Sequence, residues 1–387
     1  MRYDVLVMGL RSIADMQGGV ETHVRNLATE LDRLGITVGV FVRTPYAARG
    51  QKLPGTQVRI IRVWAPQLVA AEALLHTLLC ILYAAIMRPR LIHIHAVGPS
   101  LMVPVARLLG LRVVTTHHGE DYRREKWGKV ARRLLKMGEV CQARFSHRTL
   151  CVSRSLSAAL TSQYRREFSY VPNGVRLPKA LAPTAVLQEL QLRPQAYVLT
   201  VSRIVPEKRH LDLIAAWSRL QGDGMTLVIA GLPDLMSERY GRSVRDAAAA
   251  TRNVVLAGFR SGAELKALYE NAALFVLPSS HEGLPIALLE AMAHGCPVLV
   301  SDLPAHRDLK LGPQNYHPVG DVDDLAAKIG EHLSRTPTSP PCWESMLRPF
   351  RWTTIAAKTL AAYRDVAPAI GCEASTFPDP AEAPAAE

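Results

Sequence analysis

Two glutamates, Glu282 and Glu290, stand eight residues apart around a Gly-Leu-Pro turn and could hold a sugar nucleotide. Carboxylates accept hydrogen bonds from neighbouring hydroxyl pairs, such as those of a sugar ring or a ribose. The backbone amides of Gly283 and Leu284, which lie between the two acids, could face a phosphate. A solvated loop glutamate followed by one on an amphipathic helix explains the same spacing, so the pair alone leaves both interpretations open.

A pair of cations follows a predicted strand at residues 197–201. Arg203 and Lys208 would project from the loop at the carboxyl end of this strand, the edge at which open α/β sheets bind ligands. Paired cations there suit a diphosphate leaving group, because they offset the charge that grows in the transition state. A solvated basic loop is the alternative, and the position at the sheet edge favours a ligand site.

The first half of the chain offers a glycine turn and a histidine. Gly18 and Gly19 begin a helix after a long loop, and glycines there let the backbone approach a phosphate closely. The G-x-G-x-x-G fingerprint of dinucleotide-binding proteins is absent. His117 and His118 end a predicted strand before Gly119. A lone histidine is more often structural than catalytic, but two at a strand end beside acidic residues are also candidates for catalysis.

Asp321 and Asp323 match the D-x-D pattern of metal-using sugar transferases. They come just before an apolar helical pattern that starts at Leu325, where an aspartate serves as an N-cap. We therefore predict a helix cap at Asp321 and no bound metal.

Strands alternate with helices along most of the chain, as βαβ units require. Strands are expected at 3–8, 38–43, 58–63, 91–95, 112–116, 148–152, 197–201, 226–230, 254–257, 272–277 and 297–301. Helices are expected at 18–34, 68–87, 100–109, 124–143, 210–220, 238–250, 263–270, from about 285 to 294, and 352–366. This alternation predicts an α/β fold of two Rossmann-like, doubly wound domains that face a cleft.

The proline-containing segment 176–194 separates the two alternations. We predict an N-terminal domain over 1–176, to which the helix within about 350–370 returns, and a C-terminal domain over 177–349. The tail 373–387, rich in Ala, Pro and Glu, is predicted to be disordered.

Composition favours a cytoplasmic protein that attracts polyanions. Lys and Arg exceed Asp and Glu by 46 to 34, a formal net charge of +12, and 48% hydrophobic residues exclude wholesale disorder. Six cysteines without C-x-x-C spacing fit reduced thiols. The N-terminus lacks the order of a signal peptide, and the polar residues within 68–87 favour a core-facing helix over a membrane span.

Residues 122–148 contain nine basic residues against two glutamates, with apolar residues interleaved. A basic amphipathic helix over about 124–143 would either contact an anionic membrane surface or pack on the core and present its charges to water. Both interpretations stay open. No recognised nucleic-acid module accompanies the helix, so nucleic acid is not an expected partner.

From about residue 3 to 366, the chain resembles the family-4 retaining glycosyltransferases of the GT-B fold. The matching segments are 18–23 (GGVETH), 118–119 (HG), 171–175 (VPNGV), Arg203 with 206–208 (PEK), 258–259 (GF) and 282–290 (EGLPIALLE). The two glutamates combined with the Arg–Lys pair form the specific part of this match.

The resemblance implies a role for each candidate in the first half and for the cations. Gly19, preceded by Gly18, is similar to the loop glycine whose backbone approaches the donor diphosphate. His118 resembles the histidine that faces the donor sugar, and it is chosen over its neighbour because it directly precedes the glycine. Arg203 and Lys208 resemble the clamp on the diphosphate.

The second half supplies the remaining donor contacts that the resemblance implies. Glu282 matches the acid that holds the donor sugar hydroxyls, with Gly283 and Leu284 beside it, and Glu290 matches the acid that binds the ribose. The stretch that ends at Arg260 resembles the loop that contacts the base.

The resemblance also implies a function: transfer of a sugar with retention, from a nucleotide-sugar donor and without a metal or other cofactor. The segments of this chain look like those of bacterial members that build exopolysaccharide or surface glycans on saccharide or polyprenyl-diphosphate-linked acceptors. Such members often act on lipid-linked acceptors at the inner face of the membrane. A sugar-nucleotide epimerase of the same architecture, or a catalytically silent partner that binds nucleotide or membrane, are the alternatives.

Overall fold

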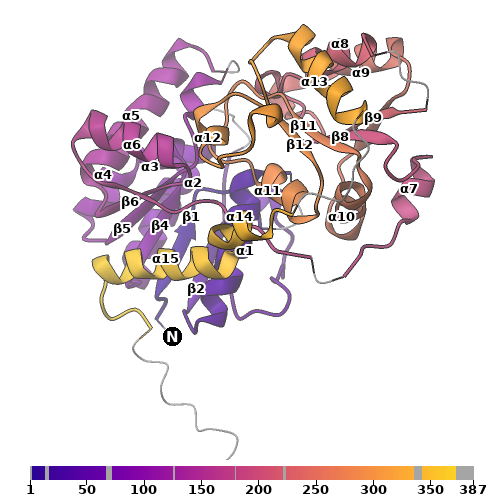
Figure 1. The fold of residues 1–387 in the computed structure, drawn as a ribbon. Helices are drawn as coiled ribbons and strands as arrows, with labels where there is room; N and C mark the ends of the chain where they lie inside the picture. Colours follow the sequence, from indigo (N-terminus) through magenta and orange to yellow (C-terminus); the bar gives the residue numbers. More distant parts are fainter. Residues whose placement is uncertain are drawn as a thin grey trace, which may run out of the picture.

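Two parallel sheets, each covered by helices, make up the computed structural model (Figure 1). The structure describes residues 2–13, 17–66, 72–124, 127–178, 180–220, 224–334 and 342–371. Within these residues the first sheet has seven strands in the order β3-β2-β1-β4-β5-β6-β7, and the second has six in the order β10-β9-β8-β11-β12-β13. Both begin with the strand order of doubly wound dinucleotide-binding folds, which confirms the predicted fold class.

The strands of the first sheet are β1 (Val5–Met8), β2 (Val38–Arg43), β3 (Arg59–Val63), β4 (Leu91–His95), β5 (Val113–His117), β6 (Arg148–Cys151) and β7 (Phe168–Tyr170). Those of the second are β8 (Tyr197–Val201), β9 (Thr226–Ala230), β10 (Val254–Gly258), β11 (Leu274–Leu277), β12 (Val298–Ser301) and β13 (Tyr316–His317). Their central strands are buried along their whole length because helices cover both faces, which explains why they appear in the sequence as apolar runs.

The first-half helices are α1 (Gly19–Arg33), α2 (Glu72–Met87), α3 (Val97–Ser100), α4 (Val103–Leu108), α5 (Lys129–Phe145) and α6 (Arg154–Tyr164). The remaining helices are α7 (Ala185–Glu189), α8 (His210–Ser218), α9 (Glu238–Ala250), α10 (Gly262–Asn271), α11 (Ile286–Ala293), α12 (Pro304–Arg307), α13 (Val322–Ser334), α14 (Glu344–Leu347) and α15 (Trp352–Val366). No helix in the described ranges is long and apolar enough to cross a membrane.

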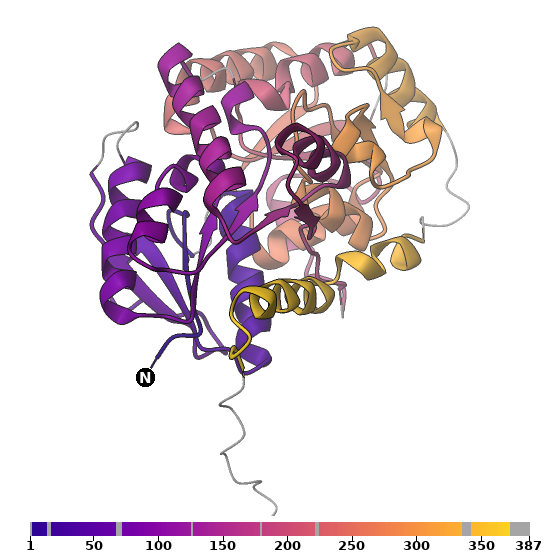
Figure 2. The ribbon, with the colours of Figure 1, turned by 90° about the vertical axis from the view of Figure 1, so that its left-hand side faces the viewer.

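The last helix, α15, returns to the first sheet and lies beside α1 (Figures 1 and 2). Trp352 and Tyr363 are buried in the same apolar core as Leu27 of α1. The Tyr363 hydroxyl also lies 2.7 Å from Nδ1 of His93 on β4. These contacts confirm the prediction that the C-terminal helix packs back on the N-terminal half.

Several elements differ from the sequence prediction. The helix expected over 100–109 is divided into α3 and α4, and Pro104 lies in the first turn of α4, where a missing N–H costs no hydrogen bond. Helix α5 begins at Lys129 rather than at 124. Helices α6, α12 and α14 and strands β7 and β13 were not predicted; the two strands have only three and two residues. Residues 68–71, 335–341 and the predicted tail 373–387 lie outside the described residues.

Candidate active site

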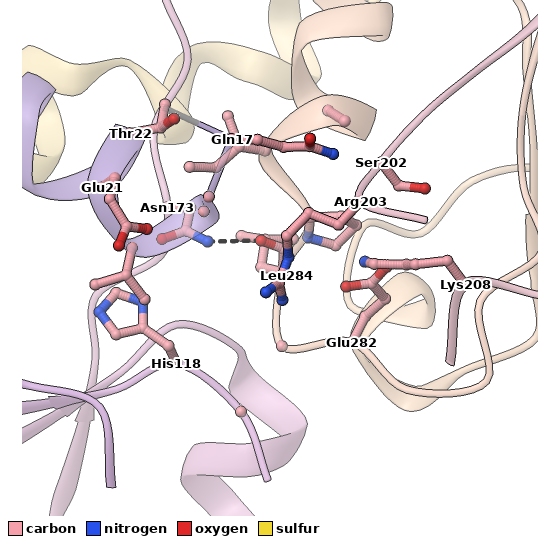
Figure 3. Close-up of a pocket in the computed structure, with 18 of the residues that line it drawn as sticks. Gln17, Glu21, Thr22, His118, Asn173, Ser202, Arg203, Lys208, Glu282 and Leu284 are labelled. Carbon is pink, nitrogen blue, oxygen red and sulfur yellow. Dashed lines mark hydrogen bonds and ion pairs between the residues drawn. The ribbon is translucent and has the colours of Figure 1, made fainter. Parts of the chain in front are cut away.

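A cavity of about 1040 Å³ opens between the two sheets and is lined by residues from both. All the residues selected from the sequence line this one cavity: Gly18, Gly19, His118, Arg203, Lys208, Arg260, Glu282, Gly283, Leu284 and Glu290. Figure 3 shows Glu21, Asn173 and His118 on one side of it and Lys208 with Glu282 on the other. The volume suits a ligand of nucleotide-sugar size.

The second sheet positions its part of the site at a topological switch point. Strands β8 and β11 are neighbours, but the chain leaves β8 toward β9 and leaves β11 toward β12, which opens a crevice at their carboxyl ends. Arg203 follows β8, and Lys208 ends the short 3-10 helix Pro206–Lys208. Glu282 follows β11. The strand order therefore explains why residues about 75 positions apart meet.

Lys208 forms an ion pair with Oε1 of Glu282, and the Ser279 hydroxyl donates to the same oxygen at 2.7 Å. Burial alone would raise the pKa of the Glu282 carboxyl, but the Lys208 ammonium outweighs it, so that the pKa lies below its usual value. Glu282 is therefore ionised at neutral pH. Among the described residues both partners bond Oε1, which leaves Oε2 for a ligand hydroxyl.

Arg203 and Arg124 line the cavity together with Lys208. Arg203 pairs with Asp234 at 3.4 Å, and Arg124, from the first half, pairs with Asp121 at 2.7 Å and lies 3.5 Å from Glu207. Burial and the nearby Arg124 guanidinium lower the pKa of Arg203. Mutually repelling guanidiniums in a shared cavity favour an anionic ligand, because it relieves the repulsion. Arg124 was not selected from the sequence, although it belongs to the basic run.

The two adjacent histidines, His117 and His118, lie in different environments. His118 is half-buried, lines the cavity, and lies with Nε2 2.9 Å from Nδ1 of His95. His117 is fully buried: its Nε2 lies 3.2 Å from Oε2 of Glu139, and its Nδ1 accepts the amide N–H of Gly119 at 3.2 Å. The structure thus places His118, the residue chosen from the sequence, at the cavity. Burial and neighbouring histidines hold the pKa of His118 well below its usual value, so it is neutral at pH 7.

The two halves of the chain touch where Gly283 meets the backbone of His118. A Cβ atom on Gly283 would lie 2.2 Å from the carbonyl oxygen of His118, so only glycine fits this approach. Beside it, the Asn173 side-chain amide donates to the carbonyl of Leu284 at 2.6 Å, the dashed contact in Figure 3. Oδ1 of Asn173 lies 2.8 Å from Nδ1 of His23.

Glu290 is the fifth residue of α11, one turn in rather than the two that were expected. The Tyr269 hydroxyl donates to its Oε2 at 3.2 Å, and burial raises the pKa of Glu290 to about 7. Arg260 lies at the cavity edge, paired with Glu189 at 2.7 Å and with Glu264 at 3.3 Å. A base that stacks or bonds there would meet a guanidinium whose orientation is already fixed.

The polar cavity residues that sequence reasoning missed come from two kinds of position. Asn173 lies inside the recognised 171–175 segment but had no role assigned. Ser279, which does not line the cavity itself but bonds Glu282, precedes the Glu282 turn. Arg124 and Gln17 lie in loops that approach the second half only in the folded chain; Gln17 accepts the amide of Leu232 at 2.9 Å.

The aspartates of the D-x-D pattern have structural partners. Oδ1 of Asp321 accepts the amide N–H of Asp324 at 2.9 Å, which confirms the predicted cap of α13. Asp323 pairs with Arg219, and neither aspartate belongs to the cavity lining.

Two Rossmann-like domains around a shared cleft define the GT-B architecture. The chain matches the model of glycosyltransferase family 4 over residues 17–178 and the model of glycosyl transferases group 1 over residues 195–335. It belongs to the family-4, group 1 glycosyltransferases.

The curated relatives match about half of the chain. One is the Escherichia coli UDP-Gal:alpha-D-GlcNAc-diphosphoundecaprenol alpha-1,3-galactosyltransferase, 28% identical over 55% of this chain and 58% of that protein. Another is the Escherichia coli O-antigen chain mannosyltransferase B, 26% identical over 53% of this chain and 54% of that protein. The matched region therefore spans little more than half the length of these relatives.

Solved structures share the fold over nearly the whole chain. Sucrose-phosphate synthase from Thermosynechococcus elongatus superposes with a TM-score of 0.80, at 20% identity, over 94% of this chain and 99% of that one. Anabaena HepE in complex with UDP and glucose gives a TM-score of 0.76, at 16% identity, over 93% of this chain and 99% of that one. At these identities the likeness shows the fold alone.

Proposed function

We propose that this protein is a metal-independent, retaining glycosyltransferase that moves a hexose from a nucleotide-sugar to a saccharide or polyprenyl-diphosphate-linked saccharide. The observation that supports it most directly is the composition of the cavity. A carboxylate pair and a cation pair from the second half line the same space as a glycine turn and a neutral imidazole from the first half. Membership of the glycosyltransferase family supports the same function.

The donor binds mainly to the second half in this proposal. Glu290 accepts the ribose hydroxyls, Arg260 contacts the base, and the free Oε2 of Glu282 accepts hydroxyls of the sugar. The amides of Gly283 and Leu284 face the phosphates. Ion pairs hold Arg260 and Glu282, and the Tyr269 hydroxyl holds Glu290, before the donor arrives, so that little ordering is needed on binding.

Departure of the nucleoside diphosphate is the step that the cations assist. Arg203 and Lys208 stabilise the growing negative charge on the diphosphate, and the glycine turn at Gly18 and Gly19 brings backbone N–H groups close to it. The acceptor hydroxyl attacks the sugar carbon on the face from which the diphosphate leaves, which preserves the configuration. His118, neutral because of its low pKa, faces the donor sugar near this carbon and offers a hydrogen bond to the sugar's oxygen atoms rather than a charge.

The first half presents the acceptor, and α5 supports a lipid-linked one. This helix exposes Val130 and Met137, 72% and 54% exposed, beside the exposed Arg132 and Arg133. Apolar tips among cations suit peripheral contact with an anionic membrane. The name of the Escherichia coli galactosyltransferase includes an undecaprenol-diphosphate acceptor. We extend this acceptor class, in surface-glycan biosynthesis at the inner face of the cytoplasmic membrane, to the present chain.

The test begins with a thermal-shift screen of UDP, GDP and dTDP and their sugars, since a ligand that binds only the folded state raises the melting temperature. The donor that is found is then used to compare wild type with Lys208→Ala. Removing one charge-stabilising group typically costs about 10²–10³ in turnover. Lys310→Ala, an exposed lysine in the same half, serves as the matched control.

Near wild-type transfer by folded Lys208→Ala would count against the proposed site. Incubation of the donor without acceptor separates an epimerase, which would convert the donor alone. Absence of both transfer and epimerisation, with nucleotide still bound, would point to a silent binding partner.

A further inference from the structure

Three imidazoles gather in the first half beside the cavity: His118 after β5, which lines the cavity, and two buried residues, His23 of α1 and His95 at the end of β4. Each offers one ring nitrogen, and these nitrogens all lie within 4.8 Å of one another. The ring centroids of His23 and His118 are 4.9 Å apart, and those of His95 and His118 are 5.2 Å apart. The proposed transfer reaction uses only His118, so the other two need an explanation.

The tautomer of His23 follows from its neighbour. Asn173 donates its amide N–H to the carbonyl of Leu284, so its Oδ1 is the atom that faces His23 and can only accept. Nδ1 of His23 must therefore donate, and Nε2 has the lone pair. A ring N–H that donates to a carbonyl-type oxygen, with the other nitrogen bare, is the usual arrangement of a metal-binding histidine.

His95 supplies a second observation. It is fully buried, and its Nδ1 lies 2.9 Å from Nε2 of His118, so these two nitrogens already face each other in the cluster. A hydrogen bond between two neutral imidazoles holds a single proton, and a zinc ion bound by both nitrogens would replace that proton.

We propose that His23, His95 and His118 bind one Zn²⁺ at the wall of the cavity, and that the bound ion inhibits the enzyme by occupying His118. Three imidazole nitrogens with one open position form a common four-coordinate zinc site. Ligand nitrogens of tetrahedral zinc lie about 3.3 Å apart. The 2.9 Å pair of His95 and His118 therefore needs little change, and His23, which lies within 4.8 Å of both, has to approach by up to about 1.5 Å. The zinc site is a regulatory addition to a reaction for which we propose no metal; its inhibitory effect rests on the proposed function.

Zinc binding is measured first on the full chain after chelator treatment, at pH 7.5, by competition with a chromophoric chelator. Co²⁺ is used as the spectroscopic probe, because its visible absorption distinguishes tetrahedral from octahedral coordination. We expect one metal per chain and tetrahedral Co²⁺ bands. Affinity should fall roughly 10²-fold or more in His95→Gln and stay unchanged in His147→Gln, an exposed histidine outside the cavity lining.

Octahedral Co²⁺ spectra, no zinc binding above the chelator control, or equal affinity in wild type and folded His95→Gln would overturn the site. If His95→Gln does not fold, the wild-type stoichiometry and Co²⁺ spectrum decide alone. In the transfer assay, zinc should inhibit wild type at the concentration at which it binds; binding without inhibition would refute the regulatory part. An enzyme without transfer activity would defeat the proposed function and leave the binding result intact.

Discussion

Replacement of Glu290 by glutamine tests whether this buried acid binds the nucleotide. In the folded protein burial raises its pKa from 4.5 to about 7, with the Tyr269 hydroxyl as its hydrogen-bond donor. Burial makes this carboxylate costly to ionise in the free protein. Its presence in the cavity is explained if the hydroxyls of a bound ribose donate hydrogen bonds that stabilise the ionised form. Glutamine keeps the shape of the side chain and removes its ionisable carboxyl group.

The sign of the effect follows from the two pKa values. Between pH 4.5 and about 7 the unfolded chain releases the Glu290 proton while the folded chain keeps it, so wild-type stability falls as the pH rises through this window. The difference corresponds to at most about 3 kcal/mol, at about 1.36 kcal/mol per pH unit. Glu290→Gln should therefore be more stable than wild type at pH 8, by several degrees in melting temperature, and nearly equal to it at pH 4.5.

Nucleotide binding should change in the opposite direction. Wild type should bind the nucleoside diphosphate best above pH 7 and lose affinity below it, by up to about tenfold per pH unit, whereas Glu290→Gln should bind weakly with no such dependence. Thermal melting and calorimetry at pH 5, 6, 7 and 8 measure both effects. Glu238→Gln, an exposed carboxylate on α9, is the control. A variant that is less stable than wild type at pH 8, or that binds nucleotide with unchanged affinity, would refute the reasoning.

Two further substitutions probe the contact between the two halves and a buried hydrogen-bond network within the first half. Gly283→Ala places a Cβ 2.2 Å from the His118 carbonyl, so we expect the lobes to separate and turnover to fall about 10²-fold, as measured in steady-state transfer assays. For Glu139→Gln we expect a loss of about 3 kcal/mol at pH 7, measured by denaturant unfolding. Burial alone would raise the pKa of Glu139, but hydrogen bonds from His117, Lys136 and Tyr164 lower it to about 2. That stability is present above pH 4.5 and is lost as the pH falls toward 2.

Each of these has its own control. Gly128→Ala adds a Cβ that meets nothing within 4 Å, so it should leave turnover unchanged. Equal turnover in the Gly283→Ala and Gly128→Ala variants would show that the close approach of Gly283 to His118 does not affect turnover. For Glu139→Gln, a destabilisation that persists undiminished at pH 2.5 would mean that the ionised network is not its cause.

Much of the fold could be predicted because its strands are buried on both faces. Strands β2, β4, β8 and β9 appear in the sequence as short apolar runs, and their predicted bounds agree with the structure. Strands β7 and β13 were missed because two or three residues are too few to show a pattern. The break between α3 and α4 depends on prolines inside one apolar segment.

The candidate site could be predicted as far as it follows strand ends and motif spacing. Residues such as Arg203 and Glu282 come directly after recognisable strands, so their convergence follows from sheet topology. Contacts that depend on how the two halves meet have no local signal. The approach of Gly283 to His118, the Asn173 bridge to Leu284 and the cluster of His23 with His95 all join residues far apart in the sequence.

The central claim is that one cavity holds the whole donor, and a crystal structure with the bound nucleotide-sugar tests it most directly. The diphosphate should lie between Lys208 and the turn at Gly19, the ribose on Glu290 and the sugar between Glu282 and His118. A nucleotide bound elsewhere on an active enzyme, or a sugar that points away from His118, would contradict it.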